Sequence, residues 1–140
     1  MIPIPKPDII KLNALRVAID DGIDNGFEYD LKLISIICNR QITNEDMEGI
    51  DEDTIDDSLV ECVYYGRPDK YEKITKEELN TLFNEIIDNR YTDGQQQWII
   101  EMLEIMYSLP SGFISEKIYY DNMSVDEIWN SIQSYKPICL

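Results

Sequence analysis

The chain of 140 residues contains no histidine, and this absence excludes several common kinds of catalytic site. A Ser-His-Asp or Cys-His catalytic set needs an imidazole, and so does a His-ligated zinc or nuclease centre. No apolar run approaches the ~20 residues that span a bilayer. The six glycines are scattered and form no phosphate-binding loop. We therefore expect a protein that is not an enzyme and that holds no cofactor and no metal.

Cysteine is also sparse. Cys38, Cys62 and Cys139 are an odd set without CxxC spacing, whereas a secreted domain of this size is expected to carry an even set of paired cysteines. Residues 1–7 lack the charged region and long apolar stretch of a signal peptide. These features predict a soluble protein of the reducing cytoplasm.

Positive charge is scarce, because 12 Lys and Arg residues stand against 28 Asp and Glu residues, a formal charge of 12 − 28 = −16. Phosphates repel such a chain, and few cations are present to release counterions, so we expect it to bind neither nucleic acid nor an anionic membrane. The imbalance favours a basic partner, or serves solubility alone.

The acids are densest between Glu45 and Glu61, where nine acids occur in seventeen residues without a cation. They are Glu45, Asp46, Glu48, Asp51, Glu52, Asp53, Asp56, Asp57 and Glu61. The run predicts a negative face for a basic partner, whose association it would accelerate. The alternative is a solvated acidic loop that leads into a helix, since Asp is favourable near a helix N-terminus. Both interpretations stay open at this stage.

One acidic segment, residues 21–26, has a partial likeness to a calcium-binding EF-hand loop. The third position of that loop needs an oxygen ligand and the twelfth a bidentate Glu. Ile23 and Lys32 occupy these positions here. We therefore do not expect calcium binding.

The second half of the chain predicts three helices with clear start signals. Thr75 and Glu78 form a capping box before a stripe of apolar residues, and Ser124 and Glu127 form another. A third helix is predicted over Asp93 to Ser108, with Gln96 three residues after its first residue. Lys136 and Pro137 are expected to end the last helix.

In the first half, apolar spacing predicts helices over residues 8–20, 30–40 and 54–65, with Gly22 and Gly66 as stops. The segment from Val60 to Tyr65 also fits a strand. The fold class is accordingly all-α, a compact helical bundle. Residues 1–70 form a helical N-terminal extension and residues 71–140 a second module, with a polar boundary at 67–73. We prefer one compact unit, because halves of about 70 residues have marginal cores.

A helix break at Pro110-Ser-Gly112 precedes the segment Ser115 to Tyr120, which ends in two adjacent tyrosines. Neighbouring tyrosines on a short helix cannot both point into the core, so at least one is expected to be exposed. An exposed tyrosine is a rigid amphipathic ring of the kind enriched at binding hot spots. The alternative is one core ring and one ring that lies on a neighbouring helix.

From about residue 73 to 136 the chain resembles the colicin/pyocin DNase immunity family, small acidic four-helix proteins that protect a bacteriocin producer from its own nuclease. The capped helices, the Pro-Ser-Gly break and the Ser-Glu-x-Ile-Tyr-Tyr segment occur in the family's order, with Glu116 in place of its Asp. The chain departs from the pattern at Phe113 and Ile114, which are two extra residues, and at Asp121, where the family usually has proline. The first 70 residues lie outside the resemblance.

The resemblance implies a four-helix bundle with a short third helix and a function as an immunity protein, an inhibitor that blocks substrate access to a basic nuclease toxin. Shared affinity would come from the short helix, and selectivity from the solvent-facing side of the helix before it. The implied toxin-binding residues are Tyr119, Tyr120, Glu116, Ser115, Asp93, Gln96, Gln97, Glu101 and Glu104. The alternative function is an acidic decoy that imitates DNA and blocks an unrelated DNA-binding protein. A dimer of the free protein stays an open alternative to a monomer.

Overall fold

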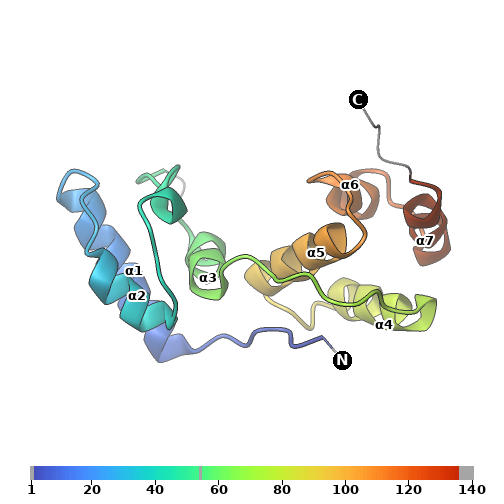
Figure 1. Cartoon of the computed structure of the whole chain (residues 1–140), viewed down its shortest axis with the longest axis horizontal. Coiled ribbons are helices and arrows are strands. Elements are labelled where there is room, and N and C mark those ends of the chain that lie inside the picture. Colours follow the sequence, from blue (N-terminus) through green and yellow to red (C-terminus); the bar gives the residue numbers. More distant parts are fainter. Residues whose placement is uncertain (1, 54, 136–140) are drawn as a thin grey trace. The chain divides into compact units, whose positions relative to one another are not determined.

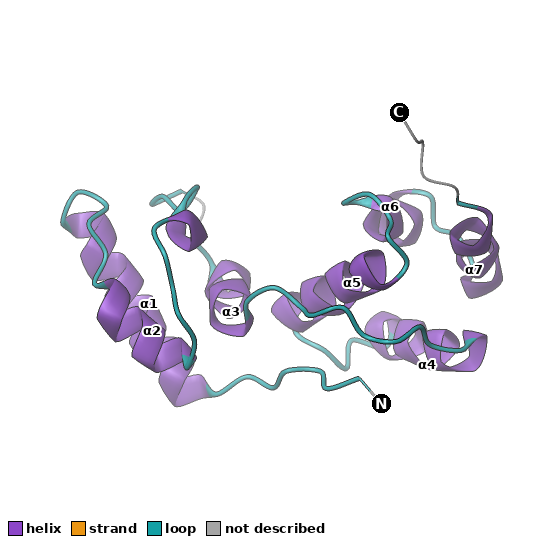
Figure 2. Cartoon of the chain, viewed as in Figure 1, coloured by secondary structure: helices purple, strands orange, loops and turns teal. Residues whose placement is uncertain are grey.

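The structure is a computed structural model that describes residues 2–53 and 55–135 (Figure 1). Within these residues every regular element is helical and there is no strand (Figure 2), so the all-α prediction is confirmed. The chain forms two compact units rather than the single unit that we preferred from the sequence. Unit 2 comprises residues 5–66, and the described part of unit 1 comprises residues 2–4 and 67–135. The division falls at the edge of the polar boundary at 67–73.

The described residues of unit 2, 5–53 and 55–66, form three α-helices and one 3₁₀ turn. These are α1 (Ile9–Asp24), α2 (Leu31–Cys38), η1 (Glu45–Met47) and α3 (Asp57–Tyr65). An aspartate precedes and caps each α-helix: the side chains of Asp8, Asp30 and Asp56 accept hydrogen bonds from first-turn backbone N–H groups. Helices α1, α2 and α3 pack against one another over a core of buried aliphatic residues that includes Leu15, Ile19, Ile34, Val60 and Val63.

Two helix boundaries in unit 2 differ from the prediction. Helix α1 continues past Gly22 to Asp24, so Gly22 is not a helix stop. A glycine is needed at this position because the ring of Tyr29 packs so closely on the helix that a Cβ atom would collide with it. Helix α2 ends at Cys38, because the next residue, Asn39, adopts a left-handed conformation with φ 54°.

The third helix of unit 2 also begins later than predicted. Helix α3 starts at Asp57 with Asp56 as its cap, and the predicted first residue, Thr54, lies outside the described residues. The segment from Val60 to Tyr65, which also fitted a strand, is helical.

Unit 1 contains α4 (Lys76–Ile87), α5 (Asp93–Met106), α6 (Phe113–Ser115), the π-helical turn η2 (Glu116–Tyr120) and α7 (Val125–Ser134). The capping boxes predicted at Thr75 and Ser124 are confirmed. Helix α5 begins at Asp93 as predicted, but its capping box is formed by Thr92 and Gln95 rather than by Asp93 and Gln96. The predicted stop at residues 136–137 and the cysteine at position 139 lie outside the described residues.

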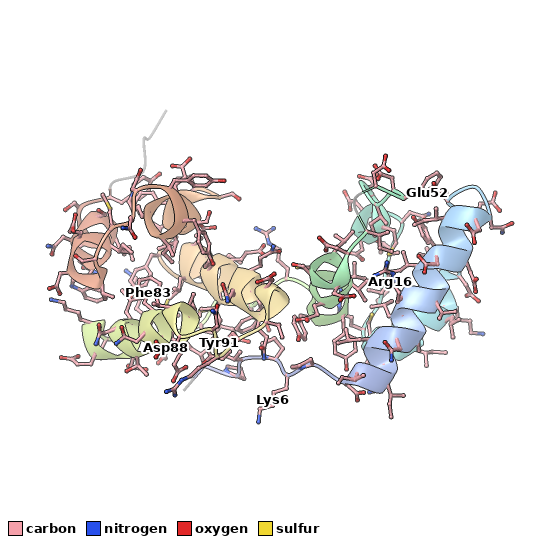
Figure 3. The ribbon with its side chains drawn as sticks, turned by 180° about the vertical axis from the view of Figure 1, so that it is seen from behind. Lys6, Arg16, Glu52, Phe83, Asp88 and Tyr91 are labelled. Atoms are coloured by element: carbon pink, nitrogen blue, oxygen red, sulfur yellow. The ribbon has the colours of Figure 1, made fainter. Side chains whose placement is uncertain are left out.

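Helix α5 is buried around most of its circumference. Its buried side chains include Trp98, Ile99, Met102, Leu103 and Met106, which together cover more than one helix face. Helix α4 packs against α7, and α5 packs against α6. In Figure 3 the ring of Phe83 lies within this unit, where it is 2% exposed. Each unit therefore has its own apolar core, and this is why the chain divides in two.

Candidate protein-interaction site

The two tyrosines of the sequence motif lie on a short helical segment that projects them outward. Gly112, with φ 89°, precedes α6, and α6 continues without interruption into the π-helical turn η2. Tyr119 is 52% exposed and Tyr120 is 84% exposed. Single π-helical turns are rare and occur frequently at functional sites. Both rings are thus available to a partner, whereas the sequence predicted only that at least one of them is exposed.

Two buried polar side chains of α5 hold this segment at its two ends. The Glu104 carboxylate accepts a hydrogen bond from the backbone N–H of Ile114, with 3.0 Å between Oε2 and N. The Tyr119 hydroxyl donates to Gln96 Oε1 at 2.9 Å. Gln96 Nε2 donates in turn to the carbonyl of Tyr91 at 3.2 Å, which orients the amide. The exposed rings therefore stand on a segment that is fixed from below.

These contacts correct the prediction for two of the site residues. Gln96 and Glu104 were expected to face the solvent, but they are 8% and 6% exposed. The prediction assumed a single apolar stripe on α5, whereas α6 and η2 cover a second side of the helix. Both residues support the tyrosine segment and are not accessible to a partner.

The remaining α5 residues of the prediction form one exposed row. Asp93, Gln97 and Glu101 recur every four residues and so lie on one side of the helix. Asp93 and Gln97 are exposed, and Glu101 is partly exposed and paired with Arg67 at 2.9 Å between Oε1 and Nε.

The tyrosine segment and the start of the α5 row come together. Asp93 lies close enough to Tyr119 to affect its titration: burial first, and then the charge of Asp93, raises the pKa of the Tyr119 phenol. The phenol therefore stays neutral at pH 7 and donates to Gln96. We call the surface formed by Asp93, Gln97, Tyr119 and Tyr120 the tyrosine face.

The other two predicted residues of the segment differ in exposure. Glu116 is exposed one turn before Tyr120. Ser115 is half-buried, and its hydroxyl donates to the Gly112 carbonyl at 3.2 Å. Glu116 can therefore contribute a charge beside the tyrosine face, whereas Ser115 serves the local turn.

Phe113 and Ile114, the two residues at which the chain departs from the resemblance, have a structural role that the sequence did not reveal. Ile114 is fully buried. The Phe113 ring packs edge-on against Tyr135 with 5.3 Å between ring centroids, and the Lys117 ammonium lies 4.0 Å above it. The signal available in the sequence was the apolar character of this pair directly after a helix break. Phe113 and Ile114 therefore attach the segment to the core of unit 1.

The acidic run of unit 2 is mostly exposed and partly occupied by local contacts. Of its nine acids, eight are exposed, whereas Glu61 is 8% exposed and accepts a hydrogen bond from Tyr65. Asp57 pairs with Arg16, and Asp56 caps α3. Glu61 was expected on a partner face, and its burial corrects that prediction.

Asp46 illustrates the local use of these acids. A hydrogen bond from the backbone N–H of Thr43 is the main reason that the pKa of the Asp46 carboxyl is lowered. The acid-rich loop of unit 2 is thus partly held by its own carboxylates.

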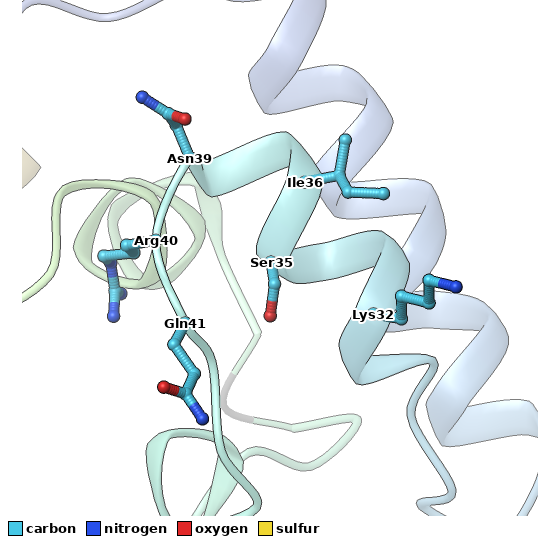
Figure 4. A pocket seen from close by; sticks show the side chains of 6 residues that line it. All are labelled: Lys32, Ser35, Ile36, Asn39, Arg40 and Gln41. Atoms are coloured by element: carbon cyan, nitrogen blue, oxygen red, sulfur yellow. The ribbon is translucent and has the colours of Figure 1, made fainter.

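Unit 2 also has a shallow hollow of about 590 Å³ between the end of α2 and the chain that follows (Figure 4). It is lined by Lys32, Ser35, Ile36, Asn39, Arg40 and Gln41. Two of its polar side chains bond within the unit, since Arg40 donates through Nη2 to the Val63 carbonyl and the Ser35 hydroxyl accepts from the Ile42 N–H, whereas the buried Nε of Arg40 has no hydrogen-bond partner among the described residues. We regard this hollow as part of the fold.

Among the described residues, no three Cys, Asp or Glu side chains lie where they could hold a metal ion. No helix within residues 2–53 and 55–135 is long and apolar enough to cross a membrane. Comparison of the chain with protein-family models, with curated proteins and with solved structures finds no match.

Proposed function

We propose that the protein is an immunity-type inhibitor that binds a basic nuclease toxin through the tyrosine face and excludes its substrate. The observation that carries this proposal is the pair of exposed rings of Tyr119 and Tyr120 on a segment fixed by α5. An aromatic side chain that is already ordered loses little conformational entropy on binding, and this is a property of interface hot spots.

The surroundings of the rings support a basic partner. Asp93 and Glu116 lie on exposed positions beside the tyrosines, and the whole chain carries a formal charge of −16. Exposed charge of one sign raises the association rate with an oppositely charged protein and selects against other partners. Inhibition by coverage of the active site requires shape and charge but no catalytic group.

The proposal predicts that a gene next to this one encodes a nuclease toxin, and it is tested with the product of that gene. We expect the purified full chain to inhibit the nuclease domain of that toxin at equimolar concentration. Tyr120→Ala should weaken binding by at least ~2 kcal/mol, the threshold of a hot spot, with most of the change in the dissociation rate. Ile87→Ala is the matched control, since Ile87 is another exposed apolar side chain of unit 1, at 67% exposure.

A melting curve of each variant separates loss of binding from loss of folding. The exposure of Tyr120 predicts an unchanged melting temperature. Unchanged affinity in Tyr120→Ala, with the protein folded, would contradict the proposal.

The acidic decoy is the second candidate, and the exposure of eight of the nine acids in the run favours it. A decoy binds several DNA-binding proteins through distributed charge, whereas an immunity protein prefers one partner strongly. Binding to a panel of unrelated DNA-binding proteins at physiological salt distinguishes the two functions.

A further inference from the structure

Unit 2 contains a pocket that neither the tyrosine face nor the fold explains. It has a volume of about 330 Å³ and lies among the α1–α2 turn and the residues around η1. Its side-chain lining is Phe27, Tyr29, Asn44, Met47, Glu48 and Ile50. Met47 and Ile50, which are 3% and 6% exposed, belong to the core of the unit and give the pocket an apolar base.

Phe27 places an aromatic ring at this pocket, and its backbone is strained in doing so. The residue has φ 63°, in the left-handed region that a bulky side chain rarely adopts, and its side chain is 51% exposed. Such strain persists only where the surrounding structure enforces it, and it is common at binding sites. Because about half of the Phe27 side chain stays exposed, burial in the free protein stabilises this conformation only in part. We infer that a bound ligand covers the exposed part of the ring.

Of the polar side chains of Tyr29 and Glu48 at the pocket, only that of Glu48 suits a cationic ligand. The hydroxyl oxygen of Tyr29 is buried and has no hydrogen-bond partner among the described residues. Burial raises the pKa of this phenol, and the charge of Asp51 raises it further, so the phenol is neutral at pH 7. Glu48 supplies an exposed carboxylate at the pocket. The Glu48 carboxylate can accept hydrogen bonds from a ligand N–H group, whereas the Tyr29 hydroxyl is enclosed by the unit and is out of a ligand's reach.

We propose that this pocket binds an arginine side chain of a basic partner protein. The planar guanidinium stacks on the Phe27 ring, its N–H groups reach the exposed Glu48 carboxylate, and its apolar stem packs over Met47. Lysine fits less well, because its compact ammonium is more strongly hydrated and lacks the planar face and the several fixed N–H donors of a guanidinium.

Charge complementarity identifies the partner as basic. Residues 5–66 carry 5 cations and 15 acids, a formal charge of 5 − 15 = −10. A second copy of this chain would meet the same negative surface and be repelled. The site lies on unit 2 and does not depend on the tyrosine face of unit 1 or on the proposed function.

The test uses the full chain and two peptides of equal charge, acetyl-Gly-Arg-Gly-amide and acetyl-Gly-Lys-Gly-amide, followed by amide chemical shifts in nuclear magnetic resonance. We expect the arginine peptide to move the signals of Phe27, Tyr29 and Glu48 and to bind more tightly than the lysine peptide. Phe27→Asn should weaken its binding about two- to fivefold, the range of an exposed cation–π contact. Asn tolerates a positive φ, so this variant removes the ring without loss of folding.

Two controls make the result specific. Glu48→Gln is expected to weaken binding, whereas Glu77→Gln, the same change of charge at an exposed position of α4 in unit 1, is not. Tyr120→Ala should leave peptide binding unchanged, so that failure here does not bear on the tyrosine face. Equal binding of the two peptides, signal changes spread over all acidic residues, or unchanged affinity in Phe27→Asn would each overturn the proposal.

Discussion

At the scale of single residues, the buried carboxylate of Glu104 has a role that its charge alone does not suggest. It accepts the hydrogen bond of the Ile114 N–H, and it is 6% exposed. Glu104→Ala leaves that N–H buried without a partner, and this costs about 1–3 kcal/mol of the free energy of unfolding. Glu104→Gln keeps an acceptor oxygen and should cost less. Urea unfolding of the two variants measures the difference, and equal losses would show that the hydrogen bond is not the cause.

Tyr91 predicts a dependence of stability on alkaline pH. Burial, followed by its hydrogen bond to Glu85, raises the pKa of Tyr91 from 10.0 to about 12. Between these values the unfolded chain releases a proton that the folded protein retains, so the free energy of unfolding falls as the pH rises through this window. The free energy of unfolding of Tyr91→Phe should therefore decrease less between pH 9 and about pH 11 than that of the unsubstituted protein. If the urea midpoints of the two proteins decreased by the same amount over this pH range, Tyr91 would not be the cause of the alkaline loss of stability.

At the scale of the elements, the capping box at the start of α5 stabilises the first turn of that helix. Thr92 and Gln95 satisfy one another's backbone N–H groups. Thr92→Ala should cost ~1 kcal/mol, the usual value for a lost N-cap. Faster hydrogen exchange of the first-turn amides of α5, with those of α7 unchanged, is the expected signature. Thr75→Ala is the matched control, because it removes the equivalent cap from α4.

The elements also show where sequence reasoning succeeds. Local chemistry determines the starts of α4 and α7, since the hydroxyl and the carboxylate of each capping box lie three residues apart. Gly22 and Gln96 show where it fails. Gly22 resembles a helix stop, yet it lies inside α1 because the Tyr29 ring needs the space of a missing side chain. Gln96 resembles a surface residue, yet η2 covers it.

The candidate site was predictable in part for the same reason. The adjacency of Tyr119 and Tyr120 made exposure of one ring necessary. The contacts that fix the rings join residues 10 and 23 positions apart, and such pairings depend on tertiary packing that no local pattern encodes. The pocket beside Phe27 likewise combines the α1–α2 turn with residues near η1, and nothing in either segment alone indicates it.

At the scale of the whole molecule, negative charge is present on both units. Unit 2 carries −10, and residues 1–4 and 67–140, with 7 cations and 13 acids, carry 7 − 13 = −6. The association rate with the basic toxin that we propose as partner should therefore decrease steeply as salt is added, because the screening length falls from ~10 Å at 0.1 M to ~3 Å at 1 M ionic strength. Stopped-flow association at several salt concentrations measures this. A rate independent of salt would show that the acidic surface does not steer the encounter.

The central claim is that the tyrosine face, and not distributed acidity, holds the partner. The most direct test compares the dissociation rate of the toxin complex for two folded variants. One variant is Tyr120→Ala, and the other replaces the eight exposed acids between Glu45 and Asp57 with Asn and Gln. We predict dissociation at least ~30-fold faster for Tyr120→Ala, the kinetic equivalent of ~2 kcal/mol, and slower association with little change in dissociation for the neutralised variant. Unchanged dissociation of Tyr120→Ala together with abolished binding of the neutralised variant would contradict the claim and leave the acidic decoy in its place.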